Sequence, residues 1–298
     1  MSFKQIFIKN KSYLSYENNS MSVKNEFTQA LVSLDDIDII IIENQQTTIT
    51  SALLSNLALA NISVVFVDEK FNPSAISMGL YKNSRTTKIQ KSQINISKPK
   101  LNRLWQTIIY SKVLNQADTL NTIKKDDTYM YSLLKKITSN DKNNVEAVSA
   151  AYYFKELFGK NFSRKDDKDN RNIALNYGYS IIRSSIVRYI IAYGLNPSFG
   201  IWHSSELNGF NLADDLIEPF RPIVDKYVLK TIGENTQVTS KNKQELVGLL
   251  YAKVKDTQNH TISVNEAIKN IVSSYQSFCL QKREDIELFG LIADEKYQ

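Results

Sequence analysis

The spacing of the apolar residues changes once along this chain of 298 residues, close to residue 100. Before that point the pattern is typical of strands. Residues 37–42, IDIIII, form a β-branched run that suits a strand buried on both faces, and residues 62–67 continue in the same style. Beyond residue 100, apolar residues recur every three or four positions, which is the spacing of helices with one buried face. The chain is therefore predicted to be an α+β protein.

The first 79 residues are predicted to form a small β-rich domain that carries one helix. Asn18 and Asn19 tolerate a positive φ, so they favour a tight hairpin between strands at 12–16 and 20–23. Residues 50–60 suit a helix, which we expect to end at Asn61.

The segment 80–100 is interpreted as a basic linker. Residues 81–100 carry six basic and no acidic side chains, whereas residues 1–79 carry five basic and eight acidic ones. The segment is polar and contains Pro99. Two roles remain open for it: a solvated connector, or a segment beside DNA phosphates in which Lys88 and Lys91 release counterions. The net charge of +6 suits a nucleic-acid partner without requiring one.

Residues 101–298 are predicted to form a larger, all-helical domain. Asn144 is the expected cap of one helix, which Gly159 ends. Gly194 ends another, and Pro197 prevents it from starting again, so that residues 195–210 form a loop. One helix begins at Leu101, one opens near Asn211, and the others cover residues 145–158, 172–193, 242–255 and 263–288.

Several common kinds of site are absent from the sequence. The chain has one cysteine, Cys279, so it cannot form an internal disulfide or a thiolate zinc site, and we expect this residue to be buried. The phosphate-binding glycine motifs and the G-x-S-x-G elbow are missing. No apolar run reaches the roughly 18 residues that span a bilayer, and the first residues do not resemble a secretion signal. A cytoplasmic protein without a membrane partner is expected.

The segment IWHSSELNGFNLADDLIEPFRP, residues 201–222, is the richest in chemistry. Asp215 and Glu218 lie three residues apart, so their carboxylates share one helical face and repel each other unless a cation lies beside them. Alternatively, acidic residues favour the positive end of a helix; with Asn211 as the cap, Asp214 would bond back to it. Pro219 and Pro222 predict a kink in this turn.

The two histidines and Glu146 differ in what their surroundings indicate. A lone loop histidine such as His203 is usually structural, although its acidic neighbours favour a functional role, whereas His260 lies in a polar stretch between helices and is expected on the surface. Glu146 falls in the first turn of its helix, where a glutamate also suits the helix dipole.

Taken together, these segments resemble a known family, the CRISPR-associated adaptation integrase, the first of the Cas proteins, and look closest to its type II-A branch. Four stretches carry the resemblance in the expected order along the chain. They are DLIEPFRP (215–222) with His203 upstream, EAVSAAYYFKELFG (146–159), LNYGYSIIRS (175–184), and DIDIIIIE (36–43) with NISVVFVDEKFNPSAI (61–76).

The resemblance implies a metal held by Glu146, His203 and Glu218, with Asp215 as a supporting catalytic acid. Two carboxylates and an imidazole suit Mg²⁺ or Mn²⁺. In such an enzyme, the 3′-hydroxyl of a short DNA fragment attacks a phosphodiester at the edge of a repeat.

The resemblance also implies partners: double-stranded DNA, a second copy of the chain bound through residues 1–79, and a small ferredoxin-like adaptation protein. A type II-A system adds a ring-forming DNA-end protein and the RNA-guided effector nuclease. Phosphate contacts are expected from basic helix faces, which would otherwise be merely solvated; the candidates are Arg164, Lys165, Arg183 and Arg188.

Two other functions remain open. The same site would cut branched or single-stranded DNA if water were the nucleophile. A non-catalytic DNA-binding scaffold would use the acidic cluster only to cap a helix.

Overall fold

The computed structural model describes residues 4–68, 73–77, 79, 84–234 and 236–292. Two compact units emerge from the contacts between residues. Unit 1 comprises Met1–Thr86 with Ile191–Gly194, and unit 2 comprises Thr87–Ile190 with Leu195–Gln298. None of the helices in the described ranges is long and apolar enough to cross a membrane. The predicted α+β class is confirmed.

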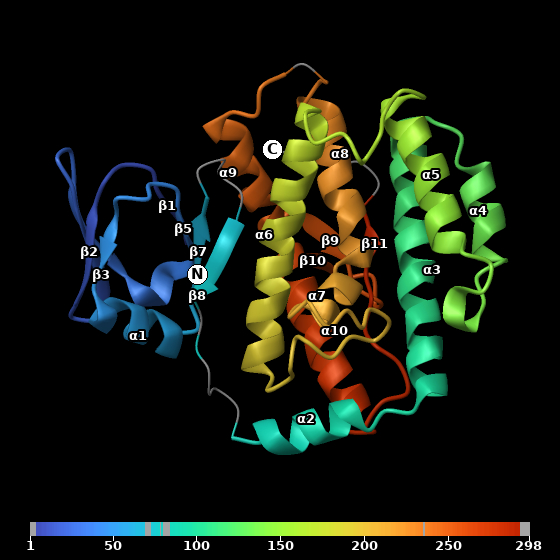
Figure 1. Ribbon diagram of the computed structural model, residues 1–298, viewed down its shortest axis with the longest axis horizontal. Coiled ribbons are helices and arrows are strands. Elements are labelled where there is room, and N and C mark those ends of the chain that lie inside the picture. Colours follow the sequence, from blue (N-terminus) through green and yellow to red (C-terminus); the bar gives the residue numbers. More distant parts are fainter. Residues whose placement is uncertain (1–3, 69–72, 78, 80–83, 235, 293–298) are drawn as a thin grey trace. The chain divides into compact units, whose positions relative to one another are not determined.

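Unit 1 contains a four-stranded sheet with a buried centre (Figure 1). The run predicted as a buried strand is β5, and all six of its residues are buried. β5 pairs in parallel with both of its neighbours, whereas β8 closes the edge antiparallel to β7. In sheet order the strands are β1 (Lys4–Ile8), β5 (Ile37–Ile42), β7 (Ser63–Val67) and β8 (Pro73–Ser77).

A second sheet of unit 1 contains the predicted hairpin. Asn18 and Asn19 join β2 to β3 with φ values of 46° and 58°, both in the left-handed region that asparagine tolerates. The helix α1 (Ser51–Leu59) is capped by Thr50, and Asn61 follows it with φ 62°. In sheet order the strands are β4 (Gln29–Ser33), β3 (Ser20–Lys24), β2 (Tyr13–Glu17) and β6 (Thr48–Ile49); the 3₁₀ turn η1 (Leu34–Asp36) leads into β5.

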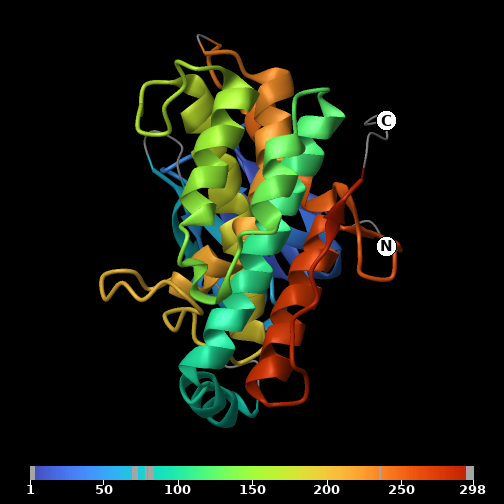
Figure 2. The same cartoon turned by 90° about the vertical axis from the view of Figure 1, so that its right-hand side faces the viewer.

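Unit 2 is built around α3, which contacts α4, α5, α7, α8 and the turn η3. Figures 1 and 2 show α3 running the length of the unit with α5 along one side. The helices are α2 (Thr86–Ile94), α3 (Lys98–Thr122), α4 (Thr128–Leu134), α5 (Val145–Phe158), α6 (Asn170–Ala192), α7 (Asn211–Leu216), α8 (Arg221–Thr231), α9 (Ser240–Gly248) and α10 (Val264–Cys279). Three 3₁₀ turns join them: η2 (Ser139–Asp141), η3 (Glu218–Phe220) and η4 (Leu249–Tyr251).

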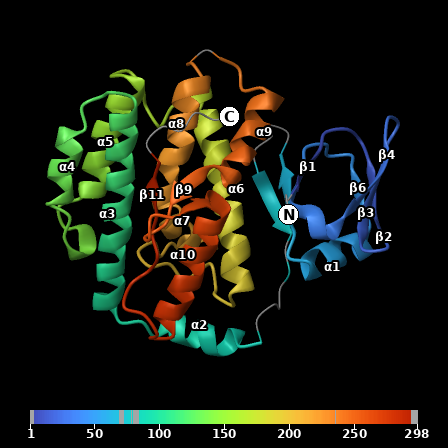
Figure 3. The same ribbon diagram turned by 180° about the vertical axis from the view of Figure 1, so that it is seen from behind.

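The prediction of an all-helical second domain is wrong in one region. α9 ends at Gly248 rather than near 255, and α10 ends at Cys279 rather than near 288. A small sheet follows these ends, seen from behind in Figure 3, and consists of β9 (Lys253–Lys255), β10 (Thr261–Ser263) and β11 (Gly290–Leu291).

A turn decides the fold of this small sheet. The Asp256 carboxylate accepts hydrogen bonds from the N–H groups of Gln258 and His260, which closes the turn between β9 and β10. The predictions for two single residues are confirmed, because His260 is exposed and Cys279 is buried.

Part of the segment predicted as a basic linker, residues 80–100, is helical, because α2 and the start of α3 lie inside it. A polar residue anchors α2. The buried Gln93 side chain donates to the carbonyls of Asn196 and Phe199 and accepts from the N–H of Asn196, at 2.9–3.0 Å. Pro99 lies in the first turn of α3, where the missing N–H costs no helical hydrogen bond. The polar composition of residues 80–100 therefore gave no indication of the helix α2.

Candidate active site

A break between α7 and α8 positions the acidic motif. Pro219 and Pro222 cannot donate helical hydrogen bonds, and the chain forms the 3₁₀ turn η3 between the two helices, as the predicted kink required. The buried Asn115 of α3 donates its side-chain amide to the Pro219 carbonyl at 2.9 Å. This hydrogen bond holds Glu218 against α3.

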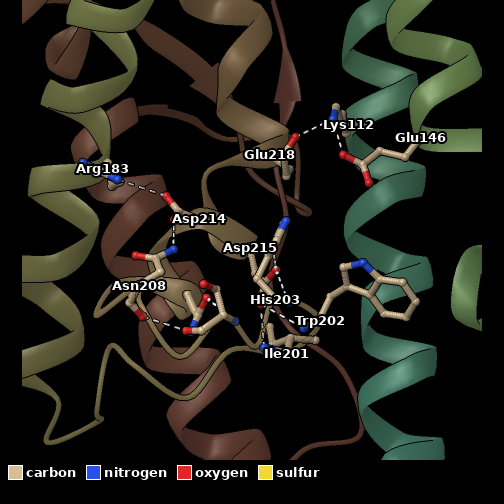
Figure 4. Close-up of polar contacts among 12 residues, drawn as sticks. Lys112, Glu146, Arg183, Ile201, Trp202, His203, Asn208, Asp214, Asp215 and Glu218 are labelled. Atoms are coloured by element: carbon tan, nitrogen blue, oxygen red, sulfur yellow. Dashed lines mark hydrogen bonds and ion pairs between the residues drawn. The ribbon is translucent and has the colours of Figure 1, made fainter.

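Asp215 fastens the loop that carries His203. Its carboxylate is fully buried and accepts three backbone hydrogen bonds: Oδ2 from the N–H groups of Ile201 and Trp202, at 2.6 and 2.9 Å, and Oδ1 from that of His203, at 3.2 Å. Oδ1 also lies 2.6 Å from Nδ1 of His203. Burial raises the pKa of Asp215, while the bonds from His203 and Trp202 favour its charged form. Figure 4 shows these contacts converging on one carboxylate.

The imidazole of His203 is held from two sides. Its hydrogen bond to Asp215 raises its pKa, although partial burial opposes the effect; the charges of Asp215, Glu218 and Glu146 raise it further. The ring of Trp105 in α3 meets the imidazole edge-on, with 5.9 Å between the ring centroids. The same ring stacks in parallel on that of Trp202, with 5.6 Å between the centroids. The loop residue His203 is therefore fixed in orientation by unit 2.

Glu146 lies in the first turn of α5, as predicted, and the side chain that accepts hydrogen bonds from the first N–H groups of this helix is not that of the N-cap residue. Asn144 occupies the N-cap position, as predicted, but it adopts φ 50° and its side chain makes no cap hydrogen bond. The Asp141 carboxylate instead accepts from the N–H groups of Val145 and Glu146 at 2.8 and 3.1 Å. Because η2 brings Asp141 back over the helix end, a residue four positions upstream of α5 does the capping.

The predicted role of Asn211 as the cap of α7 is wrong, because Phe210 occupies the N-cap position. Asn211 is buried at the start of α7, and its side-chain amide donates to the carbonyls of Ser198, Ser205 and Asn208. Asp214 accepts from the Asn208 amide at 2.7 Å and pairs with Arg183 at 3.4 Å, rather than bonding back to a cap. Asn211 thus organises the loop instead of the helix end.

Glu146 and Glu218 share one cation, the ammonium of Lys112. Nζ of Lys112 lies 2.9 Å from Oε1 of Glu146 and 2.5 Å from Oε2 of Glu218 (Figure 4). Lys112 comes from α3, Glu146 from α5 and Glu218 from η3, so three elements meet at this nitrogen. On its other side, Glu218 accepts from Nε of Arg221 at 2.8 Å.

These charges depend on each other. Burial alone would raise the pKa of Glu218, but Arg221 and Lys112 outweigh it and lower that pKa to about 2. Burial alone would lower the pKa of Lys112, yet Glu218 and Glu146 outweigh it, and the pKa is raised. Both groups therefore stay charged at neutral pH.

The carboxylates of Asp215 and Glu218 were expected to share one helical face and one cation. In the structure the two carboxylates have different partners. Asp215 is engaged by the 201–203 backbone and His203, whereas Glu218 faces Lys112 and Arg221. The cations that relieve Glu218 are thus side chains, Lys112 from α3 and Arg221 from α8. The alternative of helix-end stabilisation alone does not account for these contacts, because each carboxylate has specific partners of its own.

A family model decides the relationship of this chain to known proteins. The model of the CRISPR associated protein Cas1 matches residues 6–256. The chain belongs to the Cas1 family. It is 36% identical over 304 residues to the CRISPR-associated endonuclease Cas1 of Neisseria meningitidis serogroup C (strain 8013), covering 100% of this chain and 99% of that protein. This identity does not favour type II-A over other branches of the family, so the predicted branch stays a prediction.

Solved structures share the Cas1 fold of this chain. A casposase bound to integration product superimposes with a TM-score of 0.78 at 18% identity, covering 100% of this chain and 95% of that one. A chain of a Cas6-RT-Cas1–Cas2 complex gives a TM-score of 0.74 at 16% identity, covering 99% of this chain and 36% of that one. At these identities the likeness establishes the fold.

The side chains of Glu146, His203 and Glu218 are chemically suited to bind the metal ion that the resemblance implies. No three His, Cys, Asp or Glu side chains within the described ranges form a ready-made metal-binding group. Glu146 and Glu218 nevertheless contact the same cation, and both influence the titration of His203. Oε2 of Glu218 is buried and makes no hydrogen bond of ordinary geometry in the described part of the chain, although it pairs with Lys112. An oxygen of this kind suits a hard cation.

The predicted DNA-contacting residues fall into two groups. Lys88, Lys91 and Lys165 are exposed. Arg164 bonds Asn172 and Asn176, and Arg183 pairs with Asp214 while lying over the Phe210 ring. Arg188 is buried and bonds Asn265, which fits neither the predicted phosphate contact nor the alternative of a solvated helix face.

Lys112, Trp105 and Asn115 were not singled out from the sequence. All three are buried on α3. The signal was present in the spacing of the predicted helix from Leu101, since Lys112 and Asn115 lie seven and ten residues after Trp105 and so share its helical face. A lysine on a buried helix face needs a charged partner, and that requirement could have identified Lys112.

Proposed function

We propose that this Cas1-family chain is a metal-dependent DNA integrase that inserts spacer DNA into a CRISPR array. The observation that carries the proposal is the meeting of Glu146 and Glu218 at one cation, beside a His203 held by Asp215. Such a set of oxygen and nitrogen donors, brought together from separate elements of the fold, suits phosphoryl transfer.

Glu146, His203 and Glu218 would hold Mg²⁺ or Mn²⁺. When bound, the ion would polarise the scissile phosphate and stabilise the leaving 3′ oxygen. Asp215 occupies Nδ1 of His203, which leaves Nε2 as the nitrogen that can act as a ligand. Arg221 keeps Glu218 ionised and directed toward the site.

In the proposed reaction, the 3′-hydroxyl oxygen of the incoming DNA forms a new bond to the phosphorus at a repeat boundary. The attacking hydroxyl gives up its proton, the old phosphorus–oxygen bond breaks, and the departing 3′ oxygen takes up a proton. The number of phosphodiester bonds is unchanged, and no covalent intermediate with the protein is required. Lys88, Lys91 and Lys165 would contact DNA phosphates, since each of them is exposed.

The proposed partners are double-stranded DNA, a second copy of the chain through residues 1–79, and a small ferredoxin-like adaptation protein. The casposase bound to integration product and the Cas1–Cas2 complex support the DNA and Cas partners. A type II-A ring-forming DNA-end protein and the RNA-guided effector nuclease are proposed as further partners if the predicted branch holds.

A second candidate function is cleavage, with water in place of the 3′-hydroxyl. The word endonuclease in the name of the Neisseria relative favours it. Branched or single-stranded DNA would then be cut rather than joined. The groups at the site would be the same.

The experiment incubates the protein with a labelled oligonucleotide bearing a free 3′-hydroxyl, a supercoiled target and Mn²⁺. Each of three variants, Glu146→Gln, His203→Ala and Glu218→Gln, is expected to lower the rate of joining by about a hundredfold or more, because each change removes a proposed metal ligand. Each tenfold loss of rate corresponds to about 1.4 kcal/mol in the activation barrier. Glu156→Gln, on the same helix as Glu146, serves as the matched control and should join normally.

The products separate the alternatives. Joined product that depends on the three residues supports integration, and cut product without joining supports the nuclease. Wild-type joining by two of the three variants would overturn the site, and DNA binding without either reaction would support a scaffold.

A further inference from the structure

Lys112 is placed at the centre of the candidate site rather than beside it. Its side chain is 7% exposed, and its ammonium contacts one oxygen of each of the two carboxylates assigned to the metal. Lysine is rarely buried to this extent without ionised partners, because removing its charge from water is costly. The two glutamates meet that requirement in this chain.

The charges of the two glutamates are balanced by the two cations that contact them. Glu146 and Glu218 contribute two negative charges, and Lys112 and Arg221 contribute two positive ones. A divalent ion added to the same place would bring two more positive charges against these two cations in a largely buried region. Such an excess is unfavourable where the dielectric constant is low.

The Lys112 ammonium and a metal ion would both need the same carboxylate oxygens of Glu146 and Glu218. A Mg²⁺ ion binds its carboxylate ligands at about 2.0–2.1 Å, in direct contact. Oε2 of Glu218 already has the Lys112 nitrogen at 2.5 Å, and Oε1 of Glu146 has it at 2.9 Å. An ammonium and a metal ion cannot occupy one small space between these oxygens. The four-carbon stem of lysine allows the ammonium to move away.

We propose that Lys112 is a resident counter-cation of the active site, which holds Glu146 and Glu218 together until a divalent ion displaces its ammonium from their oxygens. The proposal rests on the proposed function, since it takes both glutamates as metal ligands. Lys112 is a positioning residue here and acts through these two carboxylates. Its presence keeps the affinity for the ion lower than the two carboxylates alone would give.

The test measures Mn²⁺ binding by isothermal titration to the full-length, DNA-free protein and to its Lys112→Met variant. Removing the competing charge is expected to tighten Mn²⁺ binding by about tenfold or more. Lys112→Arg, which retains the charge, should bind Mn²⁺ nearly as the wild type does. Lys160→Met removes a charge from an exposed position and controls for the change in net charge.

Thermal unfolding gives a second readout that does not depend on activity. With EDTA present, Lys112→Met should unfold at a lower temperature than the wild type, because two facing carboxylates lose their counter-charge. Added Mn²⁺ should raise the unfolding temperature of this variant more than it raises that of the wild type. If Lys112→Met does not fold, Lys112→Gln keeps the hydrogen-bond donors without the charge and takes its place.

The outcomes separate this inference from the proposed function. Unchanged or weaker Mn²⁺ binding by the neutral variants, with normal binding by the wild type, would overturn the role of Lys112 and leave the metal site standing. Failure of every protein to bind Mn²⁺ would overturn both proposals together.

Discussion

The Asp215 carboxylate holds the His203 imidazole at 2.6 Å and, through the same two oxygens, three consecutive backbone N–H groups of the loop that carries it. One buried side chain therefore sets both the path of the loop and the orientation of the ring. The supporting role that the family resemblance assigned to Asp215 has a physical basis in these bonds.

Asp215→Asn is expected to reduce joining and Mn²⁺ affinity by about ten- to a hundredfold, as is typical when the partner of a ligating histidine is lost. An amide nitrogen in place of one oxygen would face backbone donors, which leaves buried groups unpaired and costs about 1–3 kcal/mol in the free energy of unfolding. The measurements are Mn²⁺ titration and urea unfolding. Asp214→Asn is the neighbouring control, and equal effects from the two substitutions would contradict the assignment.

Gly200 is required by the same loop. A Cβ atom there would lie 2.2 Å from the His203 carbonyl oxygen and 2.8 Å from Oδ2 of Asp215. Gly200→Ala should therefore lower the free energy of unfolding by about 1–3 kcal/mol and slow joining, since the loop must shift. Gly209→Ala, where a Cβ would meet nothing within 4 Å, is the matched control. Equal stability of both variants in urea would refute the prediction.

Lys88 and Lys91 are predicted to contact DNA phosphates from the exposed side of α2. Each lost contact should reduce the slope of log affinity against log salt by about 0.9 for duplex DNA, so the double alanine variant should lose about two units of slope. Fluorescence anisotropy at several salt concentrations measures this slope. The exposed Lys269, changed to alanine, is the surface control, and an unaltered slope in the double variant would exclude these contacts.

Asp225 is predicted to make stability depend on pH. Burial raises its pKa to about 7, although the Tyr179 hydroxyl and the charge of Arg221 favour the ionised form. In the unfolded chain the carboxyl group titrates near about 3.9. Between these values the folded state binds more protons than the unfolded state, so this group lowers the free energy of unfolding as the pH rises toward 7 and has no further effect above it.

The Asp225→Asn variant cannot ionise and should lose this dependence. Its stability relative to the wild type is expected to increase from pH 4 to pH 7 by a few kcal/mol and then to level off. Urea unfolding at several pH values in EDTA measures the difference. Parallel curves for the two proteins would show that Asp225 does not titrate in this range.

Features that depend on single residues could be predicted from the sequence. The Asn18–Asn19 hairpin, the end of α1 just before Asn61 and the break at Pro219 all follow from local backbone preferences, which a residue carries wherever it lies. The motif around Glu218 and the position of Glu146 in its helix were likewise recognisable. Together they were sufficient to indicate the Cas1 family.

Other features were hidden because their partners are far away in the chain. Gln93 makes α2 a packed helix only through the backbone of Asn196 and Phe199, more than a hundred residues further along. The cap of α5 comes from Asp141, which only the turn η2 brings into place. Composition and spacing contain no measure of such distances.

The sequence by itself thus determined the kinds of element, their breaks and the acidic and histidine residues available for chemistry, because these depend on local preference and residue type. Only the tertiary structure decided that the Lys112 ammonium contacts both Glu146 and Glu218. It also decided that Asp215 contacts His203 and not this ammonium. The reason is that the interaction of two charges depends on their separation and burial, and both are set by the packing of α3, α5 and η3.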